Sequence, residues 1–228
     1  MFTLNQIVPW GRSFDEYRRM FALSGGDLQS TILGCADGPA SFNAEATRHG
    51  ACLTSCDPIY QYDAREIRDR IDATFDEMIE QTRQNADDFI WDSIASVDDL
   101  ARLRRAAMNT FLEDYETGKR QGRYVTAELP TTGFADSSFD LAVCSHFLFL
   151  YGVQLDEDFH VAAVRELVRV AREVRIFPVL ALGAQPSPYV PVVIDAMRRD
   201  GRDASIVTVP YEFVRGGNQM MRILNSRL

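Results

Sequence analysis

The sequence predicts an α/β fold: a seven-stranded, mostly parallel sheet whose last strand is antiparallel, with helices on both faces and a helical insert. Short apolar runs alternate with helical patterns along the chain, which is typical of strand–helix–strand units and a parallel sheet. The last two runs, at 204–209 and 219–224, are joined by a short link without a helix, so this pair is expected to be antiparallel. We treat residues 1–228 as a single domain.

The segment 31–45 predicts the start of a ligand site. Residues 31–33 form an apolar run of strand length, and a turn containing Gly34 and Gly38 follows it. Glycine allows positive φ angles and a close approach by a ligand. Pro39 suits the first turn of a helix, where the missing N–H has no intrahelical partner to lose. A strand, a glycine turn and a helix in this order predict a nucleotide-type site.

A second strand, at 52–56, ends in Asp57, which lies 19 residues after Gly38. An acid at the tip of the second strand of such a sheet can accept hydrogen bonds from both hydroxyls of a ribose. The turn and the acid together therefore predict an adenosine site.

The turn resembles the Gly-x-Gly-x-Gly turn of class I S-adenosylmethionine-dependent methyltransferases, at positions 34, 36 and 38. The segments 134–146 and 166–170 resemble the parts of that family around its fourth strand and before its fifth. The resemblance covers about 31–182 without the insert, and it implies a Rossmann-like fold and S-adenosyl-L-methionine as cofactor. Two positions depart from the family: Ile32 stands where an acid is usual, and Ala36 replaces the middle glycine, where a left-handed Cβ costs roughly 1–2 kcal/mol.

The resemblance also implies which residues hold the cofactor. The turn contributes Gly34, Ala36, Asp37 and Gly38, and the other expected contacts are Asp57, Glu128, Ser145 and Arg12. Glu128 is carried over to the adenine amino group, and Arg12 to the cofactor carboxylate.

The strand expected at 139–145 ends beside His146, which is our candidate general base. The carboxyl ends of the strands form the ligand edge of an open α/β sheet, and histidine titrates near neutral pH. His160 is a weaker candidate for this role, and His49 is expected at the surface. A cofactor-ribose or packing contact is the alternative reading of His146.

The remaining elements follow from periodicity and capping signals. Ser13 and Glu16 form a capping box for a helix at 13–23. Two amphipathic helices, at 64–83 and 97–117, make up an insert at about 58–123, with Gly118 expected just beyond the second. Because the insert leaves the ligand edge, we expect a helical lid, with a prop on the sheet flank as the alternative. Further elements are strands at 124–127 and 174–182 and helices at 156–172 and 192–199.

Charge and composition limit the partners. The net charge of −9 argues against a nucleic-acid backbone as the main partner, although a local basic patch that includes Arg104 stays open. No apolar run is long enough to span a membrane, and no signal peptide is visible. The four cysteines are expected to be reduced and buried, and no metal-ligand spacing is present. We expect a cytoplasmic protein with a small-molecule substrate, and leave a homodimer open.

The preferred function is methylation of a small molecule. One alternative is a regulatory protein that binds S-adenosylmethionine or a nucleotide without turnover, which the departures at Ile32 and Ala36 favour. An NAD-dependent oxidoreductase is less favoured, because Pro39 removes an N–H that a pyrophosphate would use.

Overall fold

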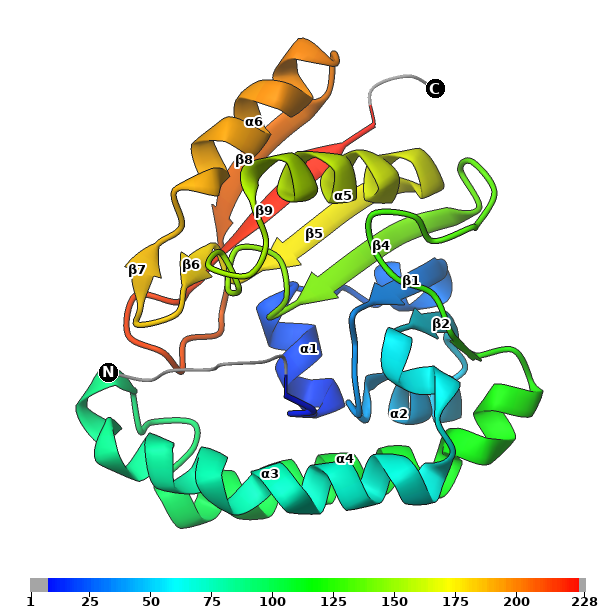
Figure 1. Ribbon diagram of the computed structural model, residues 1–228. Coiled ribbons are helices and arrows are strands. Elements are labelled where there is room, and N and C mark those ends of the chain that lie inside the picture. The colour runs from blue at the N-terminus through cyan, green and yellow to red at the C-terminus, as the bar shows by residue number, and fades with distance from the viewer. Residues whose placement is uncertain (1–7, 226–228) are drawn as a thin grey trace.

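The computed structural model describes residues 8–225, with residues 1–7 and 226–228 outside the described part (Figure 1). The sequence also predicts an irregular lead-in at residues 1–12, and residues 1–7 of it lie outside the described part.

The central sheet has seven strands in the order β3-β2-β1-β4-β5-β9-β8 (Figure 1). All pairings from β3 to β5 are parallel, and β9 runs antiparallel to both of its neighbours. This is the predicted Rossmann-like arrangement of class I methyltransferases, so the fold prediction is confirmed. The strands are β1 Thr31–Cys35, β2 Cys52–Cys56, β3 Tyr124–Val125, β4 Phe139–Ser145, β5 Ala171–Phe177, β8 Asp203–Thr208 and β9 Gln219–Leu224.

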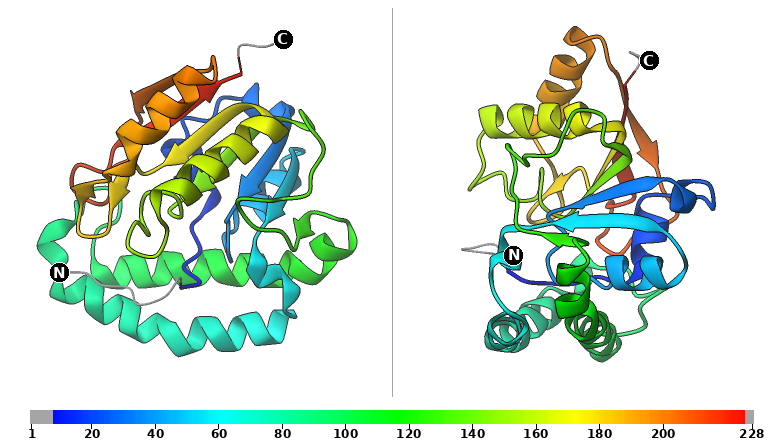
Figure 2. Two further views of the ribbon diagram at one scale, coloured as in Figure 1. Left: turned by 45° about the horizontal axis from the view of Figure 1, so that its top comes forward. Right: turned by 90° about the vertical axis from the view of Figure 1, so that its right-hand side faces the viewer.

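Helices cover both faces of the sheet because its central strands are apolar on both sides (Figure 2). Alternate residues of a strand point to opposite faces. Ile32 and Val143 accordingly pack on the face that carries α1 and α2, whereas Leu33 and Cys144 pack on the face that carries α5 and α6. These helices are α1 Phe14–Met20, α2 Phe42–Arg48, α5 Glu157–Val170 and α6 Tyr189–Arg199.

The predicted insert is a pair of long helices, α3 Ala64–Gln84 and α4 Val97–Arg120; the short turn η2 Pro58–Gln61 precedes α3, and the turn η3 Ala86–Asp88 lies between the two helices. The two helices run side by side along the carboxyl edge of the parallel strands (Figures 1 and 2). They share a separate hydrophobic core, in which Tyr60, Phe111 and Tyr115 are fully buried. The helix α4 also packs on α2, so the insert rests on the body of the domain.

The far end of the insert is fastened to the link between β8 and β9. The Ile90 amide donates to the Phe213 carbonyl at 2.8 Å, and the Arg215 amide donates to the Asp88 carbonyl at 2.9 Å. The rings of Phe89 and Phe213 stack with their centroids 4.8 Å apart. The insert therefore spans the ligand edge from β2 to the β8–β9 link, and we call this contact between 88–90 and 213–215 the clasp.

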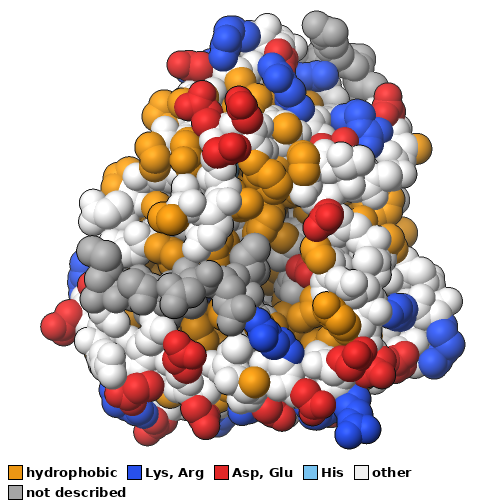
Figure 3. Space-filling view, in the orientation of Figure 1, with side chains coloured by type: hydrophobic (Ala, Val, Ile, Leu, Met, Phe, Trp, Pro, Cys, Tyr) orange, Lys and Arg blue, Asp and Glu red, His pale blue; other side chains and the backbone are white. Residues whose placement is uncertain are grey.

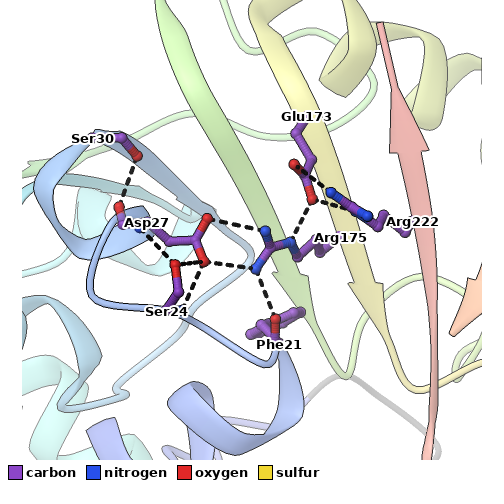
Figure 4. A network of polar contacts seen from close by, with 7 residues as sticks. All are labelled: Phe21, Ser24, Asp27, Ser30, Glu173, Arg175 and Arg222. Atoms are coloured by element: carbon purple, nitrogen blue, oxygen red, sulfur yellow. Dashed lines mark hydrogen bonds and ion pairs between the residues drawn. The ribbon is translucent and has the colours of Figure 1, made fainter. Parts of the chain in front are cut away.

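A buried guanidinium ties the end of α1 to the sheet (Figure 4). Arg175 on β5 pairs with Asp27 of the turn η1 (Asp27–Gln29) at 3.0 Å and donates to the Phe21 carbonyl at 2.9 Å. Glu173 also accepts from Arg175 at 2.7 Å and, from β9, from Arg222 at 2.7 Å. This network holds the segment after α1 against two strands.

Several predicted boundaries are wrong. The first helix ends at Met20 rather than at 23, and α2 begins at Phe42 rather than near Pro39. The fifth strand covers Ala171–Phe177 rather than 174–182, and the residues after it form a small hairpin of β6 (Leu180–Ala181) and β7 (Gln185–Pro186). The strand predicted at 124–127 spans only the two residues of β3, and α6 begins at Tyr189 rather than 192.

Two further expectations need correction. Gly118 lies inside α4 rather than beyond it; a Cβ there would overlap with the ring of Tyr124, so glycine is needed for packing. The turn after the helix uses Gly122, which has a φ of +75°. Cys35, Cys56 and Cys144 are buried free thiols, as expected, but Cys52 is exposed at the start of β2. No helix among the described residues is long and apolar enough to cross a membrane.

Candidate functional site

A cavity of about 490 Å³ lies where β1, β2 and β4 end, between the sheet and the insert. In Figure 3, hydrophobic side chains gather in the hollowed middle of this face, between the sheet and the insert. Eight of the nine site residues named from the sequence line the cavity: Arg12, Ala36, Asp37, Gly38, Asp57, Glu128, Ser145 and His146. The ninth, Gly34, lies against the carboxylate of Asp37 at the end of β1.

The glycine turn differs from the expectation in where its left-handed residues fall. Ala36 and Gly38 have φ angles of 56° and 53°, whereas Gly34 is not left-handed. A Cβ at Gly34 would instead overlap with the carboxylate of Asp37, so this position requires glycine for space. The Ala36 amide is held by the Cys56 carbonyl at 2.9 Å, which offsets part of the strain at that residue.

Asp37 is a buried acid in the middle of the turn, with 6% of its surface exposed. One carboxylate oxygen accepts from the Tyr17 hydroxyl at 2.9 Å, and the other accepts from the Ser55 hydroxyl at 2.6 Å. Burial raises the pKa of Asp37 to about 7, although both hydroxyl donors favour the charged form. Asp37 thus links the turn to α1 and β2, and it changes charge near neutral pH.

Asp57 organises the other side of the turn. Its carboxylate accepts from the Gly38 amide at 2.9 Å and from the Ile59 amide at 2.8 Å, and so caps η2. Tyr60 donates to the Gly38 carbonyl at 2.8 Å, so both the amide and the carbonyl of Gly38 are held by hydrogen bonds. Burial raises the pKa of Asp57 to about 6. A carboxylate has about four lone-pair positions, so capacity for further donors remains.

A buried ion pair lies behind the cavity and joins α4 to α1. Arg104 binds Glu16 through two nitrogens at 2.6 and 2.8 Å, and their side chains are only 1% and 4% exposed. Tyr211 also donates to Glu16 at 2.9 Å. Burial opposes the charge on Glu16, but the Arg104 guanidinium outweighs it and lowers the pKa of Glu16 to about 2. Arg104 is therefore part of the core and does not form a surface basic patch.

Arg12 is the cation of the cavity that lacks an anion. Among the described residues its guanidinium donates to the Trp10 carbonyl at 3.3 Å and forms no ion pair, and its buried Nε has no partner. Burial and the nearby Arg104 charge lower the pKa of Arg12. An anionic group of a ligand would satisfy this guanidinium.

His146 follows β4 in a left-handed conformation with a φ of 51°. Its amide donates to the Phe177 carbonyl at 2.7 Å, and its Nδ1 lies 2.9 Å from the Ser145 hydroxyl. Burial, together with the charges of Arg12 and Arg104, lowers the pKa of His146 well below its ordinary range. The ring is therefore neutral at physiological pH. A strained residue at a ligand edge is a functional candidate.

The remaining walls are mostly apolar. Glu128 is exposed on the loop after β3 and contributes a carboxylate to one side. Aromatic and aliphatic side chains form the rest, and they come from the insert, the segment after β4, α5, the β6–β7 hairpin and the β8–β9 link: Met78, Phe89, Leu100, Phe147, Leu150, Leu155, Phe159, Leu180 and Phe213. No group of three potential metal ligands lies together within residues 8–225.

The other two histidines have structural positions. His160 is buried; its Nε2 accepts from the Phe149 amide at 3.0 Å, and its Nδ1 is 2.7 Å from the Asp156 carbonyl. His49 is exposed and stacks on Phe14, as expected for a surface residue. Neither lines the cavity.

Sequence reasoning missed Tyr17, Arg104 and Tyr211, which all line the cavity. Tyr17 and Tyr211 carried no motif that set them apart from other core aromatics. Glu16 was identified only as a capping-box residue, which it is, but the same carboxylate also pairs with Arg104. An acid on the apolar side of a predicted helix was the available signal for a buried partner.

The uncharacterized protein MJ0045 of Methanocaldococcus jannaschii is 35% identical to this chain over 221 residues, which cover 96% of this chain and 97% of that protein. Magnesium protoporphyrin IX methyltransferase (ChlM) from Synechocystis PCC 6803, solved with bound SAM, is 10% identical with a TM-score of 0.47, over 93% of this chain and 91% of that one. A TehB-like SAM-dependent methyltransferase from Corynebacterium glutamicum is 15% identical with a TM-score of 0.45, over 86% and 80%. Structural likeness at this level supports no assignment of function. No protein-family model matches the chain.

Proposed function

This chain belongs to the same family as protein MJ0045 of Methanocaldococcus jannaschii, and we propose that it is a methyltransferase that uses S-adenosylmethionine to methylate a small molecule. The proposal rests on one observation above all. The left-handed turn at 36–38 and the Asp57 carboxylate meet at one end of a single cavity, joined by the bond from the Gly38 amide to Asp57 at 2.9 Å.

The polar groups of the cavity fit the cofactor at both of its ends. Asp57 has lone pairs left for ribose hydroxyls, and Glu128 supplies an acceptor for the adenine amino group. Arg12 has a buried, unpartnered Nε that suits the carboxylate of the methionine part. Ser145 and the turn residues Ala36 and Asp37 complete the proposed contacts, and Gly34 makes room for Asp37.

A small and apolar acceptor fits the rest of the cavity. Its volume of about 490 Å³ lies within the usual range for small-molecule sites, and the insert and the clasp bound it on the side away from the sheet. The walls beyond the turn are mainly aromatic and aliphatic. Alignment of the acceptor with the methyl group and exclusion of water are what such a site contributes to transfer.

Calorimetry tests the cofactor class. Titration with S-adenosylhomocysteine, S-adenosylmethionine and NAD is expected to give binding of the first two alone. Ligand at 100 times its Kd should stabilise the protein by about 2.7 kcal/mol, measured as a rise in Tm. Binding of NAD together with no response to S-adenosylhomocysteine would overturn the proposal.

The variant Asp57→Ala tests the proposed ribose contact. Hydrogen bonds to a charged group contribute about 1.5–3 kcal/mol each, so the affinity for S-adenosylhomocysteine should fall at least tenfold. The variant also loses a helix cap, which Asp156→Ala matches, because Asp156 caps α5 outside the cavity. If the two folded variants bind S-adenosylhomocysteine equally tightly, Asp57 caps η2 and makes no contact with the ribose.

A non-catalytic binding protein is the second candidate. The departure at Ile32 and the left-handed φ of 56° at Ala36 favour it, because class I methyltransferases usually carry an acid at the first position and a glycine at the second. Methyl turnover with a library of small acceptors separates the two, since a binder would take up S-adenosylmethionine without releasing S-adenosylhomocysteine.

A further inference from the structure

Two charged side chains that line the cavity, Asp37 and Arg12, have no counter-charge within the described part of the chain. Asp37 is 6% exposed, and its carboxylate accepts from the hydroxyls of Tyr17 at 2.9 Å and Ser55 at 2.6 Å, both of which are neutral groups. The guanidinium of Arg12 has a buried Nε without a partner. A buried charge without an opposite charge is unfavourable, so a ligand that supplies both missing charges would stabilise the site.

Among residues 8–225, the groups that act on Asp37 include no cation. The titratable groups whose charge influences Asp37, or is influenced by it, come from α1, β1, η2, β4 and the end of β2: Tyr17, Cys35, Tyr60, Cys144 and Asp57. Burial and the Asp57 carboxylate raise the pKa of Asp37 to about 7, so the carboxyl group is partly protonated at neutral pH in the free protein. A cation bound beside it would favour the ionised form.

The start of α1 positions both Arg12 and Asp37. Arg12 directly precedes the N-cap of α1, and its carbonyl accepts from the Ser41 amide at 3.0 Å, shortly after the glycine turn. Tyr17 lies in the same helix and donates to Asp37 at 2.9 Å. The Tyr17 ring stacks on Phe42 with the centroids 4.3 Å apart, so its hydroxyl has a fixed position. One short segment of chain therefore holds the guanidinium and the carboxylate at the turn.

A carboxylate and a guanidinium without partners complement the two charges of an amino acid, its ammonium and its carboxylate. A carboxylate has about four lone-pair positions, and the two hydroxyl donors leave room for an ammonium group at Asp37. We propose that Asp37 binds the α-ammonium group of the cofactor, opposite Arg12, and that cofactor binding is coupled to the loss of a proton from Asp37. The inference rests on the proposed function, and it assigns a specific group of the cofactor to Asp37.

The direction of the pH dependence follows from the charge of the ammonium group. A bound ammonium lowers the pKa of Asp37 from its value of about 7 in the free protein, because it favours the ionised carboxylate. Binding near neutral pH therefore releases protons, and affinity rises with pH as the free carboxyl group ionises. Asp57, whose pKa is about 6, also changes charge in this range, but it is proposed to contact the ribose. Its effect is therefore common to every ligand that carries the same adenosine.

Calorimetry with two matched ligands tests this coupling without a known methyl acceptor. The ligands are S-adenosylhomocysteine and its deaminated analogue, which keeps the adenosine, the thioether and the carboxylate but has no amino group. With a pKa of about 7, the ionised fraction of free Asp37 rises from about 3% at pH 5.5 to about 75% at pH 7.5. The ratio of the two affinities should therefore shift at least tenfold toward S-adenosylhomocysteine over this range. Its binding enthalpy should also depend on the ionisation enthalpy of the buffer more strongly than that of the analogue.

Three variants assign the coupling to Asp37. Asp37→Asn should make the ratio of affinities independent of pH. Asp88→Asn is the matched control and should keep the pH dependence, because it removes another carboxylate that lines the cavity but is exposed at the clasp. Tyr17→Phe removes a hydrogen-bond donor to the ionised form of Asp37, so the midpoint of the pH dependence should move to higher pH. This last variant keeps the test decisive if Asp37→Asn does not fold.

The possible results separate this inference from the proposed function. If the unmodified protein binds S-adenosylhomocysteine but the ratio of affinities does not change with pH, the role of Asp37 is overturned and the proposed function stands. The same conclusion holds if Asp37→Asn and Asp88→Asn show equal pH dependence, or if the midpoint is unchanged in Tyr17→Phe. If S-adenosylhomocysteine and S-adenosylmethionine do not bind at any pH, the proposed function itself is overturned.

Discussion

Replacing Glu16 with Gln is expected to lower the free energy of unfolding by about 3–5 kcal/mol. The change keeps the shape of the side chain but leaves the Arg104 guanidinium without an anion. Both side chains are almost fully buried, at 4% and 1% exposed, so water cannot replace the lost partner. Domains of this kind are stable by about 5–15 kcal/mol, so the variant should still fold but with a clearly reduced margin.

The pH dependence of stability gives a second value for the free energy that the pairing of Glu16 with Arg104 contributes. The pKa of Glu16 falls from 4.5 to about 2 in the folded protein. At about 1.4 kcal/mol for each unit of pKa, this difference corresponds to roughly 3 kcal/mol of stability. Because the folded pKa is the lower one, this stabilisation is complete above about pH 5 and is lost as the pH falls through 4.5 toward 2. The difference between the two proteins should therefore shrink below pH 4.5.

Urea unfolding at pH 7 and at pH 3.5 measures both effects, provided that the m-value is unchanged between variants. Asp200→Asn is the matched control: it removes the charge of a carboxylate that pairs with Arg165 at the surface, where the two side chains are 37% and 53% exposed. Such a pair contributes at most about 1 kcal/mol. The reasoning is refuted if Glu16→Gln costs no more than this control, or if its cost is the same at both pH values.

Three further outcomes test the turn and the insert. Gly34→Ala should destabilise the protein by about 2 kcal/mol or more, because the new methyl group overlaps with the Asp37 carboxylate. Adding Asp37→Ala to the same chain should recover part of the loss, and losses that are additive in urea unfolding would contradict the overlap. Ala36→Gly should raise the free energy of unfolding by about 1 kcal/mol, because relief of roughly 1–2 kcal/mol of left-handed strain exceeds the entropic cost of glycine. An unchanged urea midpoint would refute this expectation. Hydrogen exchange at 86–91 should slow when S-adenosylhomocysteine binds, and maximal protection in the free protein would exclude opening of the clasp.

Local patterns were sufficient for the fold. Alternating faces such as Ile32 and Leu33 are visible as apolar runs, and the capping box at Ser13 is visible as a four-residue spacing. The antiparallel end of the sheet followed from the length of the last link alone. Such signals involve neighbours in the chain, which is why they can be read without the structure.

The wrong predictions concern residues whose environment is set by a contact with another part of the chain. The first residues of β5 carry charges that resemble the end of a helix, but Glu173 pairs with Arg222 of β9, 49 residues away in the chain. Gly118 resembled the end of a helix, yet it is there because of the Tyr124 ring. Arg104 resembled a surface cation, and only the contact with Glu16, 88 residues away, makes it a core residue.

The candidate site shows the same division. The sequence brought together the turn, Asp57 and His146, because each lies at the end of a predicted parallel strand and such ends meet at one edge. It gave no reason to connect Asp37 with α1. That connection needs Tyr17, whose hydroxyl reaches from α1 to the turn across 20 positions of sequence.

The insert is held more strongly at α4 than at the clasp, and this difference determines the route by which a ligand enters the cavity. The helix α4 is joined to α1 by the buried pair of Arg104 and Glu16 and packs on α2, so its movement would expose charged groups and core. The clasp contains two backbone hydrogen bonds, the stacked rings of Phe89 and Phe213, and a bond from the exposed Arg215 guanidinium to the Phe89 carbonyl at 3.4 Å, each of which contributes on the order of 1 kcal/mol. Opening at the clasp therefore costs a few kcal/mol, whereas opening at α4 costs more than the pair alone. Of these two routes, entry by release of the clasp is favoured, while α4 stays in place as a wall and keeps Arg104 near His146.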